Sequence, residues 1–280
     1  MRILIIGATG MLGHDCCEHF LKFNSYEIFA TCRNSEDLVL EPHEKLKVYD
    51  DVDILVFERI KEITLSIKPD IVINCAGAIK QKEIGINPIQ AIEINGLFPH
   101  KLATLAEDLD FKLILVSTDC VFNGKKGMYT EEDASDCNDI YGKSKYIGEI
   151  GNNENVLTIR TSIIGLEKKS NLSLLSWFLS QSGEVNGFKN AIYSGVPTFF
   201  LAEFIRNNHK LSGLYQLSSQ PISKFELLHI FKDYFNHNIE IHDDLDFSID
   251  RSLESSKLEK EIGFKKESWE TLINFLPKEV

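Results

Sequence analysis

Tyr141 and Lys145 lie four residues apart in the stretch YGKSK, and together they could deliver a proton. A free tyrosine has a pKa of about 10, which makes it a weak acid near neutral pH. On a helix, residues four apart share a face, and a lysine ammonium there favours the phenolate and shifts the acid toward working pH. The alternative is an ordinary polar pair on a solvated helix. The elements around the pair must decide between the two.

Short apolar runs alternate with longer helical patterns along the chain. We expect strands at 2–7, 27–33, 46–50, 70–77, 112–118 and 156–165. We expect helices at 11–23, 53–69, 88–109 and around 141–149. Apolar strands separated by helices indicate a parallel sheet covered on both faces, and right-handed crossovers make it doubly wound. The sequence therefore predicts an α/β fold, with a Rossmann-type domain over residues 1–165. A smaller α/β lobe is expected over 166–280, with segments that can interleave with the first domain.

A glycine-rich loop, GATGMLG, places Gly7, Gly10 and Gly13 between the first expected strand and the first expected helix. A dinucleotide pyrophosphate needs this combination of unusual backbone angles, close backbone approach and free N–H groups at a helix start. Arg33 ends the second strand in TCRNSED, where NAD-selective sites tend to carry an acid. An arginine there suits a 2′-phosphate. We therefore predict NADPH as the cofactor, with NADH as the alternative.

Composition excludes several classes of protein. The formal net charge of −12 argues against nucleic acid as a partner, because phosphate backbones recruit basic surfaces. The 6 cysteines show no CxxC spacing, so we predict reduced thiols and no metal site. The first apolar run breaks at Gly7, and no later run is long enough to span a bilayer. We expect a cytoplasmic protein with no membrane partner.

An ordered set of motifs runs nearly from end to end of the chain. Its members are GATGMLG, VINCAGA (72–78), AIEINGLFPHKLA (91–103), STDCVFNG (117–124), YGKSKYIGE (141–149), IRTS (159–162), SGVPT (194–198) and DRSLESSKL (250–258). With these motifs the chain resembles the extended short-chain dehydrogenase/reductases, and among them the dTDP-4-dehydrorhamnose reductases. The resemblance implies NADPH-dependent reduction of a nucleotide-linked 4-keto-6-deoxyhexose for cell-surface polysaccharide synthesis.

The resemblance also implies roles for individual residues. Tyr141 would donate the proton, Lys145 would assist it and hold the nicotinamide ribose, and Thr118 would hydrogen-bond the substrate carbonyl. The implied cofactor contacts are Gly7, Gly10, Met11, Leu12 and Gly13 around the dinucleotide, Asp51 and Val52 near the adenine, and Cys75, Ala76 and Gly77 along the pyrophosphate–ribose path.

The chain departs from the family pattern at two positions where the sugar or the nicotinamide should lie. The family usually has tyrosine after the Thr-Asp pair and an aromatic residue after RTS, whereas this chain has Cys120 and Ile163. A UDP-linked 2-acetamido-4-keto-6-deoxyhexose is therefore an alternative substrate. A 4,6-dehydratase would be expected to carry Thr-Asp-Glu, which is not found here. A nucleotide-sugar epimerase and a non-catalytic NADP-binding regulatory subunit remain alternatives.

A nucleotide sugar is the expected partner, and it requires a local cationic patch on this acidic chain. Candidates for the diphosphate are Arg160, Lys189, Arg206 and Arg251, of which the resemblance favours Arg251. Asn190 and Thr198 lie in a glycine-punctuated stretch, NGFKNAIYSGVPT, which we interpret as a loop that closes over the sugar or connects the lobes. Asp119 is expected to orient Thr118, to contact substrate or to cap the loop. A homodimer is compatible with the sequence.

Overall fold

The structure is a computed structural model that describes residues 1–79 and 87–278. The described residues divide into two compact units. Unit 1 comprises Met1–Ser117, Asn138–Ile159 and Leu201–Leu214, and unit 2 comprises Thr118–Cys137, Arg160–Phe200 and Tyr215–Val280. The chain thus passes from one unit to the other several times.

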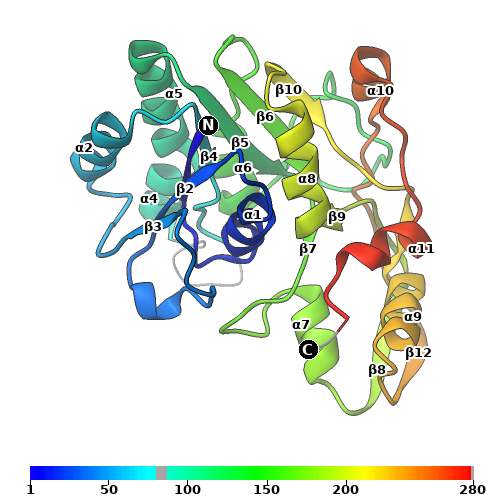
Figure 1. The fold of residues 1–280 in the computed structure, drawn as a ribbon. Coiled ribbons are helices and arrows are strands. Elements are labelled where there is room, and N and C mark those ends of the chain that lie inside the picture. Colours follow the sequence, from blue (N-terminus) through cyan, green and yellow to red (C-terminus); the bar gives the residue numbers. More distant parts are fainter. Residues whose placement is uncertain (80–86, 279–280) are drawn as a thin grey trace. The chain divides into compact units, whose positions relative to one another are not determined.

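The described residues form a seven-stranded sheet with the order β10-β6-β5-β4-β1-β2-β3 (Figure 1). Its strands are β1 (Arg2–Ile6), β2 (Glu27–Thr31), β3 (Leu46–Tyr49), β4 (Ile71–Asn74), β5 (Lys112–Thr118), β6 (Val156–Thr161) and β10 (Gly213–Gln216). β1 pairs in parallel with both β2 and β4. The strand order reverses at this point, and ligands of open α/β sheets bind beyond the carboxyl ends of such strands. The predicted fold class is confirmed.

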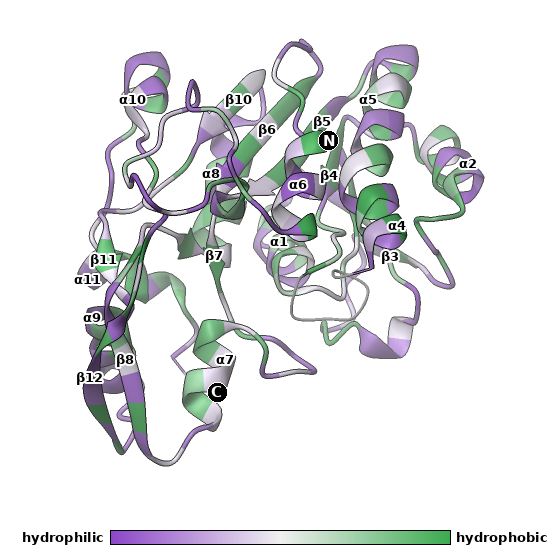
Figure 2. Ribbon diagram, turned by 180° about the vertical axis from the view of Figure 1, so that it is seen from behind, coloured by the Kyte–Doolittle hydropathy of each residue, from purple (hydrophilic) through white to green (hydrophobic). Residues whose placement is uncertain are grey.

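Most expected helices of unit 1 are present with shifted ends. They are α1 (Met11–Leu21), α2 (Phe57–Ile67), α4 (Pro88–Ala91), a π-helix η2 (Ile92–Leu97), α5 (Phe98–Leu109) and α6 (Ile140–Ile147), with a short 3-10 turn η1 (Ser35–Asp37). α2 begins later than expected because the Asp53 carboxylate accepts from the N–H of Leu55 and forms a turn at 2.9 Å. Hydrophobic and hydrophilic residues alternate along α2 and α5 (Figure 2). Their apolar side chains, such as Ile60 and Leu102, pack with strand residues such as Leu4 and Val72 in one core.

Unit 2 contains a small sheet in the order β11-β8-β12. Its described strands and helices are β7 (Ile163–Ile164), α7 (Leu174–Ser180), β8 (Gly183–Tyr193), β9 (Val196–Pro197), β11 (Ile222–Ser223), α9 (Lys224–Tyr234), β12 (Ile239–Asp250), α10 (Ser256–Ile262) and α11 (Trp269–Leu272), with the 3-10 turns η3 (Asp119–Val121) and η4 (Ile273–Phe275). α8 (Thr198–Asn208) begins in unit 2 and belongs mostly to unit 1.

The loop expected around Asn190 and Thr198 is wrong. Asn190 lies within β8, which pairs with β12 along its length, and Thr198 is the first residue of α8. Gly187, which suggested a loop, is needed for close packing instead. A Cβ on Gly187 would lie 3.0 Å from the Cα of Phe225. Gly187 therefore marks a close backbone approach inside a strand. Within the described residues, no helix is long and apolar enough to cross a membrane.

Candidate functional site

The glycine loop connects β1 to α1, and its glycines meet different demands. Gly7 has a φ of +82°, and a Cβ there would lie 2.9 Å from the backbone nitrogen of Ala76. A Cβ on Gly13 would overlap with the carbonyl of Gly7, whereas one on Gly10 would make an ordinary contact of 3.4 Å. Gly7 and Gly13 are therefore required by the fold. Gly10 is exposed at the helix start and leaves room for a ligand.

The start of α1 fits a pyrophosphate. Gly10 is the N-cap, its carbonyl accepts from the N–H of His14 at 2.8 Å, and among the described residues no side chain caps this end. The first turn also contains no acid. The backbone N–H groups of Met11 and Leu12 are thus available at the positive end of the helix dipole, as a bound diphosphate requires.

The ends of β2 and β3 lie together and carry the residues expected near the adenosine. The Asp50 carboxylate accepts from the N–H and the hydroxyl of Ser35, each at 2.7 Å, and these hydrogen bonds hold the pKa of Asp50 below its ordinary value. The N–H of Val52 donates to the carbonyl of Cys32 at 2.9 Å. Asp51 is exposed, with a φ of +54°. Arg33 is also exposed, and no hydrogen bond or ion pair with another described residue occupies its guanidinium.

The segment after β4 joins the glycine loop to the helix that carries the reactive pair. Cys75 donates its N–H to Ile6 at 2.9 Å, and Ala76 packs against Gly7. Two residues further on, the backbone of Ala78 exchanges two hydrogen bonds of 2.9 Å with the buried side chain of Asn95. Asn95 lies in the π-helix η2 and also donates to the Ser144 hydroxyl of α6 at 3.1 Å. One amide side chain thus links β4 to α6.

α6 is held tightly at both ends. The Asp139 carboxylate accepts from the N–H of Gly142 at 2.7 Å and caps the helix start. At the other end, a Cβ on Gly148 would overlap with the carbonyl of Asn95, and a Cβ on Gly96 would lie 3.1 Å from Ile147. Two glycines therefore allow α6 and η2 to approach closely. This packing fixes the helix that carries Tyr141 and Lys145.

Lys145 is anchored to the central sheet. Its Nζ donates to the carbonyl of Val116 on β5 at 2.7 Å. Burial lowers the pKa of Lys145 to about 8, and the Glu149 carboxylate partly opposes this shift. Glu149 in turn accepts from the Ser117 hydroxyl at 2.6 Å. A cavity of about 10 Å³, lined by Lys145 and Asn95 among others, has the volume of roughly one water molecule. Tyr141, one turn earlier, is half-buried.

In unit 2 the Thr-Asp-Cys segment caps itself. The Thr118 hydroxyl donates to Asp119 at 3.2 Å and accepts from the N–H of Cys120 at 3.1 Å. Arg251 reaches this segment from the chain after β12. Its Nε donates to the carbonyl of Phe122 at 2.9 Å and its Nη1 to the sulfur of Cys120 at 3.4 Å. The structure thus brings together Cys120 and Arg251, which are far apart in sequence.

The other predicted cationic and polar residues make contacts within the protein. Arg160 is only 2% exposed, and its guanidinium lies 5.0 Å from the ring centroid of Phe122. Asn190 donates to Leu245 of β12 at 3.2 Å, and Thr198 donates to Ile164 at 3.4 Å. Lys189 pairs with Asp243 at 2.7 Å. Arg206 lies in unit 1, over the ring of Phe23 at 4.3 Å.

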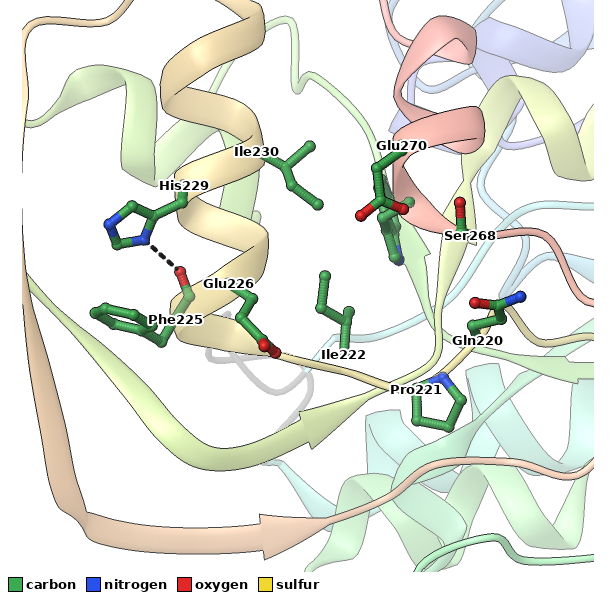
Figure 3. A pocket seen from close by; sticks show the side chains of 10 residues that line it. Gln220, Pro221, Ile222, Phe225, Glu226, His229, Ile230, Ser268 and Glu270 are labelled. Carbon is green, nitrogen blue, oxygen red and sulfur yellow. Dashed lines mark hydrogen bonds between the residues drawn. The ribbon is translucent and has the colours of Figure 1, made fainter.

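A pocket of about 420 Å³ in unit 2 contains none of the predicted residues (Figure 3). It lies along α9, where Nδ1 of His229 is 3.0 Å from the carbonyl of Phe225. Both of its carboxylates already serve helix starts. Glu226 forms a capping box with Ser223, and a hydrogen bond with Ser268 lowers the pKa of Glu270. This pocket therefore does not add to the site.

Sequence reasoning assigned no role to Asn95, Ser144, Asp139 or Tyr193. Asn95 and Ser144 lie inside family motifs, and the spacing of Asp139 before Gly142 is that of a helix cap, so these three had a signal. Tyr193 had none. Its position becomes visible only when β8 is placed beside the Thr-Asp-Cys segment.

Known proteins resemble the chain in sequence. A 27% identical relative is the Rattus norvegicus protein "Methionine adenosyltransferase 2 subunit beta", aligned over 166 residues that cover 58% of this chain and 47% of that protein. A 31% identical relative is "Probable low-salt glycan biosynthesis reductase Agl14" of Haloferax volcanii, over 150 residues, 53% of this chain and 48% of that protein. The chain spans about half the length of these curated relatives.

Solved structures share the fold over almost the whole chain. A hypothetical dTDP-4-dehydrorhamnose reductase from Sulfolobus tokodaii has a TM-score of 0.80 at 26% identity, covering 99% of this chain and 100% of that one. The dTDP-4-dehydrorhamnose reductase of Bacillus anthracis in complex with NADP has a TM-score of 0.78 at 23% identity, covering 96% of each chain. The family model described as "RmlD substrate binding domain" matches residues 1–230. The chain therefore belongs to this family of extended short-chain dehydrogenase/reductases.

Proposed function

We propose that this protein is an NADPH-dependent reductase of a nucleotide-linked 4-keto-6-deoxyhexose that serves cell-surface polysaccharide synthesis. One observation carries the proposal: the contacts of Asn95 with Ala78 and Ser144 join the glycine loop region to the helix of Tyr141 and Lys145. The glycine loop proposed to bind the cofactor and the helix proposed to carry the proton donor are thereby connected by hydrogen bonds within unit 1. The names of the two solved relatives support the reaction class.

The chain's own residues supply proton delivery and positioning. Reduced nicotinamide, when bound, supplies the hydride. Tyr141 gives its phenolic proton to the carbonyl oxygen of the sugar as charge develops there. The ammonium of Lys145, fixed on Val116, stabilises the phenolate that Tyr141 then carries. The role of Thr118 toward the substrate carbonyl stays a prediction, because its hydroxyl donates to Asp119 in the structure.

The preference for NADPH depends on Arg33. Its guanidinium is exposed directly after β2, where the 2′-substituent of the adenosine ribose is read in this fold. A planar guanidinium binds a phosphate in a bidentate manner and gains nothing comparable from a hydroxyl. The NADP complex of the Bacillus anthracis relative supports the same preference.

The test is oxidation of NADPH with a panel of nucleotide-linked 4-keto sugars, both thymidine-linked and uridine-linked with a 2-acetamido group. We expect turnover with at least one sugar and formation of the 4-hydroxy product by NMR. Tyr141→Phe is the matched control, because it keeps the ring and removes only the hydroxyl that carries the proton. No turnover with any sugar, by protein that binds NADPH, would contradict the proposal.

A second candidate is a non-catalytic NADP-binding regulatory subunit. The curated relatives named as methionine adenosyltransferase 2 subunit beta favour it. Its partner would be the catalytic chain of a methionine adenosyltransferase. The test adds the purified protein to such an enzyme and measures its kinetic constants. If this candidate is right, wild type and Tyr141→Phe change the kinetic constants of that enzyme to the same extent. Neither protein then reduces a keto sugar.

A further inference from the structure

Tyr193, the last residue of β8, is a buried phenol that the proposed reaction does not use. Its side chain is 9% exposed and lies in unit 2. β8 is anchored here on both sides, because Tyr193 pairs with Ile222 of β11 and the preceding Ile192 pairs with Asp250 of β12. The backbone that carries the phenol is therefore fixed by two neighbouring strands.

The phenol of Tyr193 lies against Gly195. A Cβ on Gly195 would overlap with the hydroxyl of Tyr193 and with the carbonyl of Ser162. The same carbonyl accepts from the N–H of Val196 at 2.9 Å, and Val196 pairs with Ile163. Gly195 thus provides the space into which the Tyr193 ring turns back, beside the segment Ser162–Ile163.

The surroundings of the phenol are those of the sugar side of the proposed site. The Ser162 side chain forms a hydrogen bond with the phenol, and Asp119 and Cys120 act on it electrostatically. Burial raises the pKa of Tyr193 well above its ordinary value, and the two acidic neighbours add to this shift. Tyr193 therefore stays neutral at working pH, and its hydroxyl can donate a hydrogen bond.

This arrangement bears on the two positions where the chain departs from the family pattern. The aromatic residues usual after Thr-Asp and after RTS are Cys120 and Ile163 here. Tyr193 lies near both replacements. Cys120 acts electrostatically on its phenol, and Ile163 pairs with Val196, three residues after Tyr193. A phenol is thus supplied from β8 where the segment after β5 lacks one.

We propose that Tyr193 is a positioning residue of the substrate site, which supports the Asp119–Cys120 segment from beneath Gly195 in place of the aromatic side chains absent at 120 and 163. This inference rests on the proposed function, because it assigns the supported segment to the sugar. Tyr193 acts through its neighbours and takes no part in the proton transfer itself. It is expected to determine sugar affinity and not cofactor affinity.

Steady-state kinetics with the best sugar of the panel form the first test. Tyr193→Phe removes one buried hydroxyl, so the KM for the sugar should rise about tenfold while kcat stays within about twofold. The KM for NADPH should not change. Tyr129→Phe is the matched control, since Tyr129 is a buried phenol of unit 2 that donates to Asn123 at 3.2 Å. An unchanged sugar KM in Tyr193→Phe overturns the proposal.

A swap tests the replacement directly. Cys120→Tyr adds the family phenol while Tyr193 occupies the space beside it, and we expect the sugar KM to rise about tenfold or more. In a Tyr193→Ala background the same substitution should recover most of that loss, because only one phenol is then present. Equal effects of Cys120→Tyr in both backgrounds would refute the claim that Tyr193 takes the place of the aromatic residue absent at position 120.

A third measurement does not need turnover, so it separates this proposal from the proposed function. Iodoacetamide modification of Cys120 is followed by peptide mass spectrometry, with the half-buried Cys75 of unit 1 as internal reference. Tyr193→Ala should speed modification of Cys120 about threefold or more by removing its support, and leave Cys75 unchanged. Should wild type reduce no sugar, the proposed function fails while this result still decides the position of Tyr193. An unchanged Cys120 rate overturns the inference.

Discussion

The glycine loop with α6 in unit 1 and the Asp119–Cys120 segment in unit 2 are stabilised in different ways. In unit 1 the contacts come from residues inside the family motifs, with Asn95 and two glycines joining η2 to α6. In unit 2 one contact involves a position where this chain departs from the pattern, because Arg251 donates to the sulfur of Cys120. From this difference we expect the proposed proton and hydride transfer to depend on the shared contacts of unit 1. We expect the choice of sugar to depend on the packing around Cys120 in unit 2.

The largest expected effect removes the proton donor. Tyr141→Phe should lower kcat by about 10²–10⁴-fold, the contribution usual for a positioned general acid. NADPH affinity should stay within about twofold, because the phenol hydroxyl contributes to transfer more than to binding. Stopped-flow kinetics and fluorescence titration measure the two quantities. Near wild-type kcat would break the comparison, since chemistry would then not reside on α6.

Titration of Lys145 sharpens the comparison by pH. With a pKa of about 8, the ammonium is lost above that pH, and kcat should fall about tenfold per unit once the phenolate loses its partner. Stability should change in the opposite sense. The unfolded chain binds this proton up to about pH 10.4, so between about 8 and 10.4 stability rises with pH. Lys145→Met should remove that rise, as measured by urea unfolding at several pH values.

The glycines separate folding from cofactor binding. Gly10→Ala adds only an ordinary contact, so thermal stability should be nearly unchanged while the Kd for NADPH rises about tenfold through loss of close approach. Gly13→Ala forces a Cβ onto the carbonyl of Gly7 and should lower the melting temperature as well. Calorimetry of both variants decides. Equal destabilisation by the two would show that Gly10 is also a folding residue.

Arg33→Ala should lower the preference for NADPH over NADH about tenfold, because a guanidinium contact to the 2′-phosphate is lost. The ratio of kcat/KM for the two cofactors measures it. Arg59→Ala is the control, since Arg59 is an exposed arginine of α2 that pairs with Glu62 at 3.3 Å. An unchanged ratio in Arg33→Ala would contradict the cofactor assignment.

The smallest expected effect lies in unit 2. Arg251→Lys keeps the charge but loses the forked contact with Phe122 and Cys120. The sugar KM should rise about fivefold, with no change in the KM for NADPH. A change in the cofactor KM of similar size would erase the distinction between the two regions.

The positions of β1 to β6 were predictable, because buried parallel strands appear as continuous apolar runs with helices between them, whereas β10 was not predicted. The π-helix at 92–97 was not, since its apolar residues also fit a regular helix. β8 was mistaken for a loop because Gly187 gives the same signal for close packing as for a turn. Contacts such as Lys145 with Val116 or Arg251 with Cys120 join distant segments, and no local pattern contains them. The roles assigned to individual site residues stay predictions.

The π-helix at Ile92–Leu97 means that the number of residues in this segment matters for the proposed site. A π turn holds a residue in excess of what a regular helix uses. Deleting one residue there would leave Pro88–Ala91 and Phe98–Leu109 facing their present neighbours, so the protein should still fold. Asn95 would then lose the bulge that lets it reach both a strand exit and another helix. A shortened homologue would thus keep the fold, lose stability at the backbone of Ala78 and fail in an assay.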